Sequence, residues 1–174
     1  MPPPGLLEII TALLFAAMAY RFGWSLDLLA YSALAAACVP LATLDWTVRK
    51  LPNVALATTS MTMLAIFGLE VSLDAEADKL LRAIACMLTA VAAHGVLYAL
   101  DGVAGGDVKL AGVLGLPLGW LSWQAACVGL AVGWLLGGLF VAFVKVFRRH
   151  RVTDDVALGS FLTSGALIVI LTGP

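Results

Sequence analysis

Two aspartates in apolar surroundings are the residues of this sequence best suited to chemistry. Asp45 precedes segment 51–53, Leu-Pro-Asn, and Asp107 belongs to segment 105–110, Gly-Gly-Asp-Val-Lys-Leu. Ionisable residues are costly to keep at membrane depth, so those found there are candidates for function. Two adjacent carboxylates cannot both ionise easily, and a pair that shares one proton offers a base and an acid together. Such a pair could hydrolyse a peptide bond, one aspartate activating water while the other protonates or polarises the carbonyl.

The neighbours of each aspartate suit a reaction site. Pro52 restricts the residue before it to an extended backbone, and Asn53 could cap the helix that follows. Gly105 and Gly106 permit backbone conformations and a close approach that side chains would block, so an extended peptide could lie against them. We therefore expect these four residues to support the aspartates.

Each aspartate also has a simpler interpretation. Asp45 could be an interfacial residue that offsets Arg49 and Lys50, and Asp107 could be only a helix N-cap. The glycine segment is not a phosphate-binding loop, because Lys109 is not preceded by Gly and no Ser or Thr follows it. The residues by themselves leave these alternatives open.

The elements that must position these residues are apolar helices. The chain has 174 residues, of which 62% are hydrophobic and 12% are charged, with a mean hydropathy of +1.03. This is too apolar for a soluble domain, and a helix needs about 20 apolar residues to cross a bilayer. We predict one all-α domain, residues 1–174, a polytopic transmembrane bundle of six to seven spans. The predicted spans are 6–22, 28–44, 53–72, 80–100, 108–121, 123–144 and 156–172.

The basic residues predict the orientation of the bundle. Loops after the first, third and fifth spans hold fewer Lys and Arg than the other loops, and basic loops stay in the cytoplasm. Both aspartates and the N-terminus are then expected at the cytoplasmic face of the membrane. The net charge of −1 offers no basic face, so we expect the lipid bilayer, and no nucleic acid, as a partner.

Other polar and small residues are interpreted as structural. His94 and Tyr98 share one helix face and are expected to make a polar contact inside the bundle. Gly129, Gly133 and Gly137 are spaced to let a neighbouring helix approach closely. We expect no metal or other cofactor, since two histidines far apart do not make a zinc site. The cysteines lie in apolar runs without a CxxC pair and are expected to act as small hydrophobes: Cys38, Cys86 and Cys127.

The segments around the two aspartates resemble the signatures of the type IV prepilin leader peptidases, which belong to the GxGD class of intramembrane aspartic peptidases. The match is Asp-x5-Leu-Pro-Asn at 45–53 and Gly-Gly-Asp-Val-Lys-Leu at 105–110. The resemblance implies an endopeptidase of type IV pilus or type II secretion systems. It would cut the basic leader from prepilins or pseudopilins at the cytoplasmic face, after a glycine. Asp45 and Asp107 would be the catalytic pair, with Gly106 and Lys109 in support.

Three departures from the family pattern shape these expectations. Long members carry a cysteine-bearing loop and methylate the new N-terminus, whereas this sequence begins where that loop would end, so we expect cleavage without methylation. Ala104 stands where the GxGD motif has its first glycine, and segment 157–162 replaces a proline-containing stretch.

An inactive relative is one alternative function for this chain. A small proton- or cation-coupled transporter is another, although transporters usually hold their site near the midplane. Asp101 competes as the second acid but lacks the Gly-Gly context.

Overall fold

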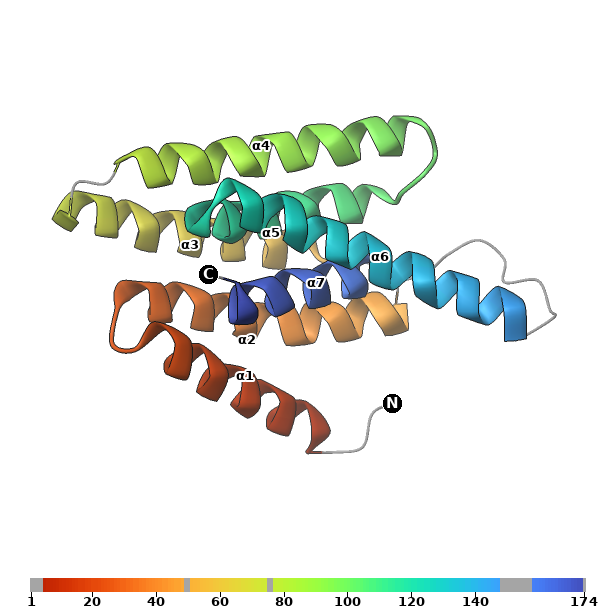
Figure 1. The fold of residues 1–174 in the computed structure, drawn as a ribbon, viewed down its shortest axis with the longest axis horizontal. Coiled ribbons are helices and arrows are strands. Elements are labelled where there is room, and N and C mark those ends of the chain that lie inside the picture. The colour runs from red at the N-terminus through yellow and green to blue at the C-terminus, as the bar shows by residue number, and fades with distance from the viewer. Residues whose placement is uncertain (1–4, 49–50, 75–76, 148–157, 174) are drawn as a thin grey trace.

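The computed structural model describes residues 5–48, 51–74, 77–147 and 158–173. Within these ranges the chain is all-α, which confirms the predicted class, and successive helices run in opposite directions (Figure 1). The helices are α1 (Leu6–Phe22), α2 (Leu26–Val48), α3 (Asn53–Asp74), α4 (Ala77–Ala99), α5 (Gly105–Leu121), α6 (Trp123–Phe147) and α7 (Leu158–Thr172).

Helix length separates the described helices into two groups. Four are long and apolar enough to cross a membrane by themselves: α2, α3, α4 and α6, each of 21 to 24 residues. The other three are shorter, with 17 residues in α1 and α5 and 15 in α7. These lie near or below the lower limit of about 17 residues for a full crossing.

Helix α5 forms the centre of the bundle. It contacts α3, α4, α6 and α7, and all of its residues from Leu110 to Trp120 are buried. Its glycines allow α4 to pack almost backbone to backbone: a Cβ on Gly115 would lie 2.9 Å from the carbonyl oxygen of Cys86. Because other helices cover α5, its hydrophobic residues contact protein side chains in place of lipid.

The glycines of α6 pack against neighbouring helices, as the sequence suggested. A Cβ on Gly133 would lie 2.7 Å from the Cα of Leu162 in α7, and one on Gly129 would lie 2.8 Å from Leu118 in α5. Gly138 differs, because a Cβ there would meet no atom within 4 Å. Its side of α6 is therefore open.

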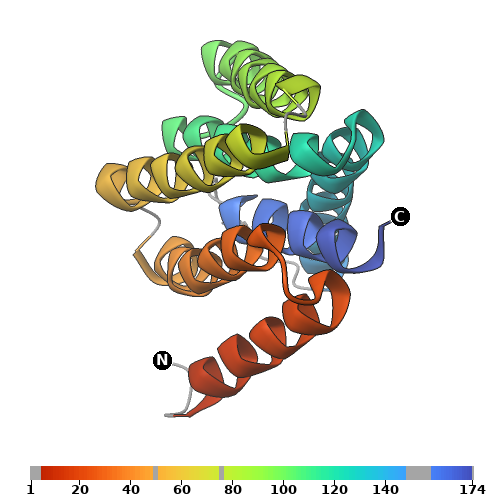
Figure 2. The same ribbon diagram turned by 90° about the vertical axis from the view of Figure 1, so that its left-hand side faces the viewer.

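The two ends of the bundle have different polar contacts. At one end Arg82 of α4 donates hydrogen bonds to the carbonyl oxygens of Gly119, Trp120 and Leu121, at 2.7, 2.6 and 3.2 Å. These carbonyls lie in the last turn of α5, where no N–H of the helix can reach them, so Arg82 supplies the hydrogen-bond donors. At the other end, on the right of Figure 1, α2, α4 and α6 finish and α3, α5 and α7 begin. The second view shows α7 enclosed between α2 and α6 (Figure 2).

The structure tests two predicted contacts. His94 makes the predicted polar contact inside the bundle, since Trp134 Nε1–H donates to His94 Nε2 at 3.1 Å, whereas Tyr98 is exposed. Asn53 does not cap α3: the first helical bond runs from the N–H of Leu56 to the carbonyl of Pro52, so Pro52 occupies the cap position. Periodicity along one helix does not fix which neighbouring helix a side chain faces.

Candidate active site

Asp45 lies in the last turn of α2. This helix continues to Val48, whereas the predicted span ended at residue 44. Its side chain is 6% exposed. The carboxylate Oδ2 accepts a hydrogen bond from the backbone N–H of Ser160 at 2.8 Å and lies 3.1 Å from Ser160 Oγ. The same hydroxyl is 3.0 Å from the carbonyl oxygen of Ala42. Asp45 is therefore tied to α7, and this burial argues against a purely interfacial residue.

Asp107 lies in the first turn of α5 and is 7% exposed. It is not the N-cap, since that position belongs to Ala104, which makes no side-chain capping bond. The backbone N–H groups of Ala104 and Gly159 lie close to the Asp107 carboxylate. The contact with Ala104 is the backward reach that an acidic third residue makes in a capping box. The contact with Gly159 again leads to α7.

The beginning of α7 brings the two aspartates together. Adjacent residues of its first turn, Gly159 and Ser160, direct one N–H to Asp107 and one to Asp45. The free N–H groups and the dipole of a helix N-terminus favour negative charge. The two carboxylates are also close enough to interact electrostatically. One helix start thus holds two acids that are far apart in the sequence.

Gly159 is packed so closely that only glycine fits without movement. A Cβ at this position would lie 2.9 Å from Asp45 Oδ2 and 3.0 Å from Leu110 Cδ2. The missing side chain lets α7 approach α2 and α5 at once. Close approach, and not an unusual backbone angle, is the reason for glycine here.

The predicted supporting residues lie at the same end of the bundle as the two aspartates. Gly105 and Gly106 are the first two residues of α5 and do not have positive φ angles, so the conformational freedom that glycine offers is not used there. A Cβ on Gly106 would make ordinary contact with Leu51, at 3.5 Å. Lys109 donates to the side-chain oxygen of Asn53 at 2.7 Å in an exposed position. This bond ties α5 to α3 beside the aspartates.

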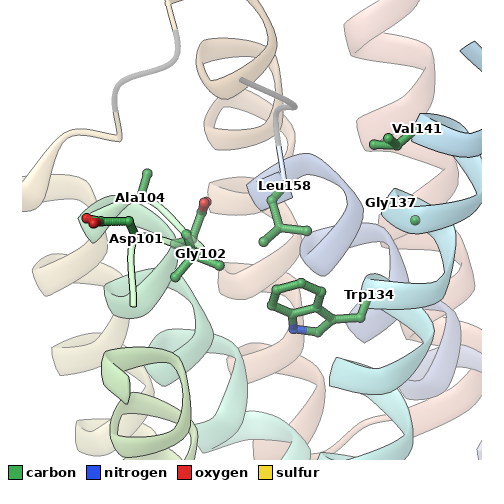
Figure 3. Close-up of a pocket in the computed structure, with 10 residues that line it drawn as sticks. Asp101, Gly102, Ala104, Trp134, Gly137, Val141 and Leu158 are labelled. Atoms are coloured by element: carbon green, nitrogen blue, oxygen red, sulfur yellow. The ribbon is translucent and has the colours of Figure 1, made fainter. Parts of the chain in front are cut away.

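A cavity of about 520 Å³ opens on one side of Asp107. Figure 3 shows Trp134 and Leu158 facing the turn that carries Asp101, Gly102 and Ala104. Asp101 is exposed, and its φ of 56° is a left-handed conformation that aspartate tolerates better than most side chains. It does not share the position of Asp107 against α7.

Sequence reasoning missed Gly159, Ser160 and Trp134 as parts of this region. Segment 157–162 was treated only as a departure from a pattern, although its Gly-Ser pair opens a helix at the same end as both aspartates. That placement was the available signal. Among the described residues, no group of three or more His, Cys, Asp or Glu side chains could hold a metal ion. The arrangement is suited to acid–base chemistry on a bond brought to the two carboxylates.

Comparison with known proteins supplies independent information. A model described as the type IV leader peptidase family matches residues 32–148. A prepilin leader peptidase/N-methyltransferase of Bacillus subtilis is 30% identical over 166 residues, which cover 95% of this chain and 64% of the relative. One of the same name from Aeromonas salmonicida is 32% identical over 73 residues, covering 42% of this chain and 24% of the relative. The chain thus spans less than two thirds of either relative. No solved structure matches it.

Proposed function

This chain belongs to the type IV leader peptidase family, and we propose that it removes the leader peptide of a prepilin or pseudopilin. The observation that carries this proposal is the convergence of two buried carboxylates, Asp45 and Asp107, on the first turn of α7. Both belong to the segment matched by the family model. We further propose that they act as an aspartic pair at the cytoplasmic face of a bacterial inner membrane and cut after a glycine.

The proposed mechanism needs one proton shared by the pair. One carboxylate takes a proton from a water molecule as the water oxygen attacks the scissile carbonyl carbon, while the other gives its proton to the carbonyl oxygen. The tetrahedral intermediate then collapses: the carbon–nitrogen bond breaks and the nitrogen leaves with the proton taken from water. The carbonyl proton returns to the carboxylate that gave it. Ser160 fixes Oδ2 of Asp45, so we assign the proton transfer to Oδ1.

The printed names of the relatives also include N-methyltransferase activity. We do not extend that second activity to this chain, because a pair of carboxylates accounts only for hydrolysis. The proposal is accordingly cleavage without methylation. A substrate would be identified by its basic leader and by the glycine before the cleaved bond.

The test is cleavage of a co-expressed prepilin in membranes by the parent protein and by Asp45→Asn and Asp107→Asn. Asparagine nearly keeps the shape of aspartate but cannot carry the proton, and loss of acid–base catalysis costs about 10²- to 10⁴-fold. We expect the parent to release a product whose N-terminal sequence begins after the leader glycine, and both variants to release none in the same time. The exposed Asp78→Asn in the first turn of α4 is the control.

Two results would contradict the proposal. A parent protein that cuts none of several prepilins would favour an inactive relative or a transporter. Asparagine variants that cut as well as the parent would remove the aspartates from the reaction. Asp101→Asn decides the remaining assignment, because it should lose far less cleavage than Asp107→Asn if Asp107 is the second acid.

A further inference from the structure

The cavity beside Asp107 has two unlike walls. One wall carries two carboxylates, Asp101 and Asp107, beside Gly102, Val103 and Ala104 in the turn between α4 and α5. The facing wall is formed by α6 and the first residue of α7, and its side chains are apolar: Trp134, Val141 and Leu158. Figure 3 shows these side chains across the opening from Asp101 and Ala104. A cavity of about 520 Å³ falls within the range of small-molecule and peptide sites, roughly 300–1,000 Å³.

Trp134 is held in place by a hydrogen-bond relay from α4. Its Nε1–H donates to His94 Nε2 at 3.1 Å, and His94 Nδ1 lies 2.9 Å from the carbonyl oxygen of Ala90. Since the carbonyl can only accept, the proton of His94 is on Nδ1 and the ring is neutral. His94 is 4% exposed, so turning Trp134 away would leave a buried acceptor without its donor. The indole is therefore a fixed part of the wall.

Glycine leaves the floor of the cavity open. Gly137 and Gly138 of α6 both line it. A Cβ on Gly137 would lie 3.2 Å from Leu158, whereas one on Gly138 would meet nothing within 4 Å. Within the described residues, no protein atom lies within 4 Å of that added carbon, and Gly138 and Asp107 line the same cavity.

We propose that this cavity receives the apolar peptide segment of the substrate that adjoins the cleaved bond, and that Trp134 and Gly138 set the size of residue it accepts. The inference rests on the proposed function. A peptide has polar amides and apolar side chains, which match the two walls, whereas a lipid chain would match only the wall formed by α6 and α7. A segment lying there would bring its backbone to Asp107.

The first test enlarges residue 138 stepwise: Gly138→Ala, Gly138→Val and Gly138→Leu. Because the first added carbon meets no protein atom, these variants should fold, which thermal unfolding in detergent can check. We expect kcat/KM for prepilin cleavage to fall along the series, reaching tenfold or more for leucine, with most of the change in KM. The control is Gly68→Leu in α3, where an added Cβ also meets nothing within 4 Å. Replacing the prepilin residue next to the cleaved bond by alanine should recover part of the loss.

The second test locates the bound peptide by disulfide cross-linking in the Asp45→Asn variant, which does not cut it. In a Cys127→Ser background, Val141→Cys should cross-link to a cysteine placed beside the cleavage site of the prepilin. Val128→Cys, which is 50% exposed on the same helix, should not.

The outcomes separate the two proposals. If the parent cleaves but Gly138→Leu cleaves equally well, or if both cysteines cross-link alike, the cavity is not the peptide site and the peptidase proposal stands. If the parent cleaves nothing, the peptidase proposal fails, and the cross-linking result alone decides whether the cavity binds the peptide.

Discussion

Replacing Gly159 by alanine would place a methyl group between α7 and the two helices that carry the aspartates. The added carbon would lie 2.9 Å from Asp45 Oδ2, 3.0 Å from Leu110 Cδ2 and 3.1 Å from Asp45 Cγ. Ordinary contacts begin near 3.4 Å, so the carboxylate or α7 must move by about 0.5 Å. Leu110 cannot easily move away from the added methyl group, because its side chain is itself buried in the core.

The size of the effect follows from that displacement. Misplacing a reacting group by about 1 Å can cost roughly 100-fold in rate, so a shift of half that size is expected to cost about tenfold or more. Overpacking destabilises by about 1–3 kcal/mol, and alanine returns about 0.5–1 kcal/mol by favouring the helix. The variant should therefore remain folded while its cleavage rate falls by roughly 10- to 100-fold.

The assay is the initial rate of prepilin cleavage per folded molecule, with thermal unfolding measured in the same detergent. Gly68→Ala is the matched control, since its new carbon meets no atom within 4 Å. A Gly159→Ala protein that cleaves at the parental rate would refute the argument that α7 positions Asp45. A loss that only follows the fraction unfolded would refute it as well.

Two further predictions concern contacts outside the aspartate pair. Arg82→Leu removes three hydrogen bonds from the last carbonyls of α5. We therefore expect the free energy of unfolding to fall by about 2–4 kcal/mol in thermal or denaturant unfolding, with near-parental cleavage per folded molecule. A lower cleavage rate at unchanged stability would contradict a structural role. Lys109→Ala and Asn53→Ala each remove an exposed hydrogen bond. A double-mutant cycle of unfolding free energies should therefore give a coupling below about 1 kcal/mol. If Lys109→Ala instead loses as much cleavage as Asp107→Asn, Lys109 takes part in the reaction.

The sequence is informative about the helices and about the meeting of the aspartates. Apolar runs separated by polar turns predicted six to seven spans, and the seven helices of the described residues lie close to the predicted ranges. Asp45 and Asp107 are separated by two helices, one leading away and one returning, so topology alone places both at one end of the bundle. Because this placement does not depend on side-chain contacts, the sequence is sufficient to predict it.

The contacts of α7 and His94 could not be predicted in the same way. Gly159 and Ser160 contact the aspartates through backbone N–H groups, which every residue except proline has. Residue type therefore does not identify these two positions in the sequence. The pairing of His94 with Trp134 depends on how α4 and α6 are rotated about their axes. Such rotations are set by close packing across the whole bundle, including the contact of α4 with Gly115 and Gly119.

The position of α7 in the chain has a consequence for the timing of assembly. During synthesis Asp45 and Asp107 are made, and can enter the membrane, before Gly159 and Ser160 exist. Until those two residues arrive, the carboxylates lack two of the N–H donors that fix their geometry. The pair therefore becomes ordered only after α7 has inserted between α2 and α6. Before that step, the growing chain contains both aspartates but lacks the geometry that the first turn of α7 gives them.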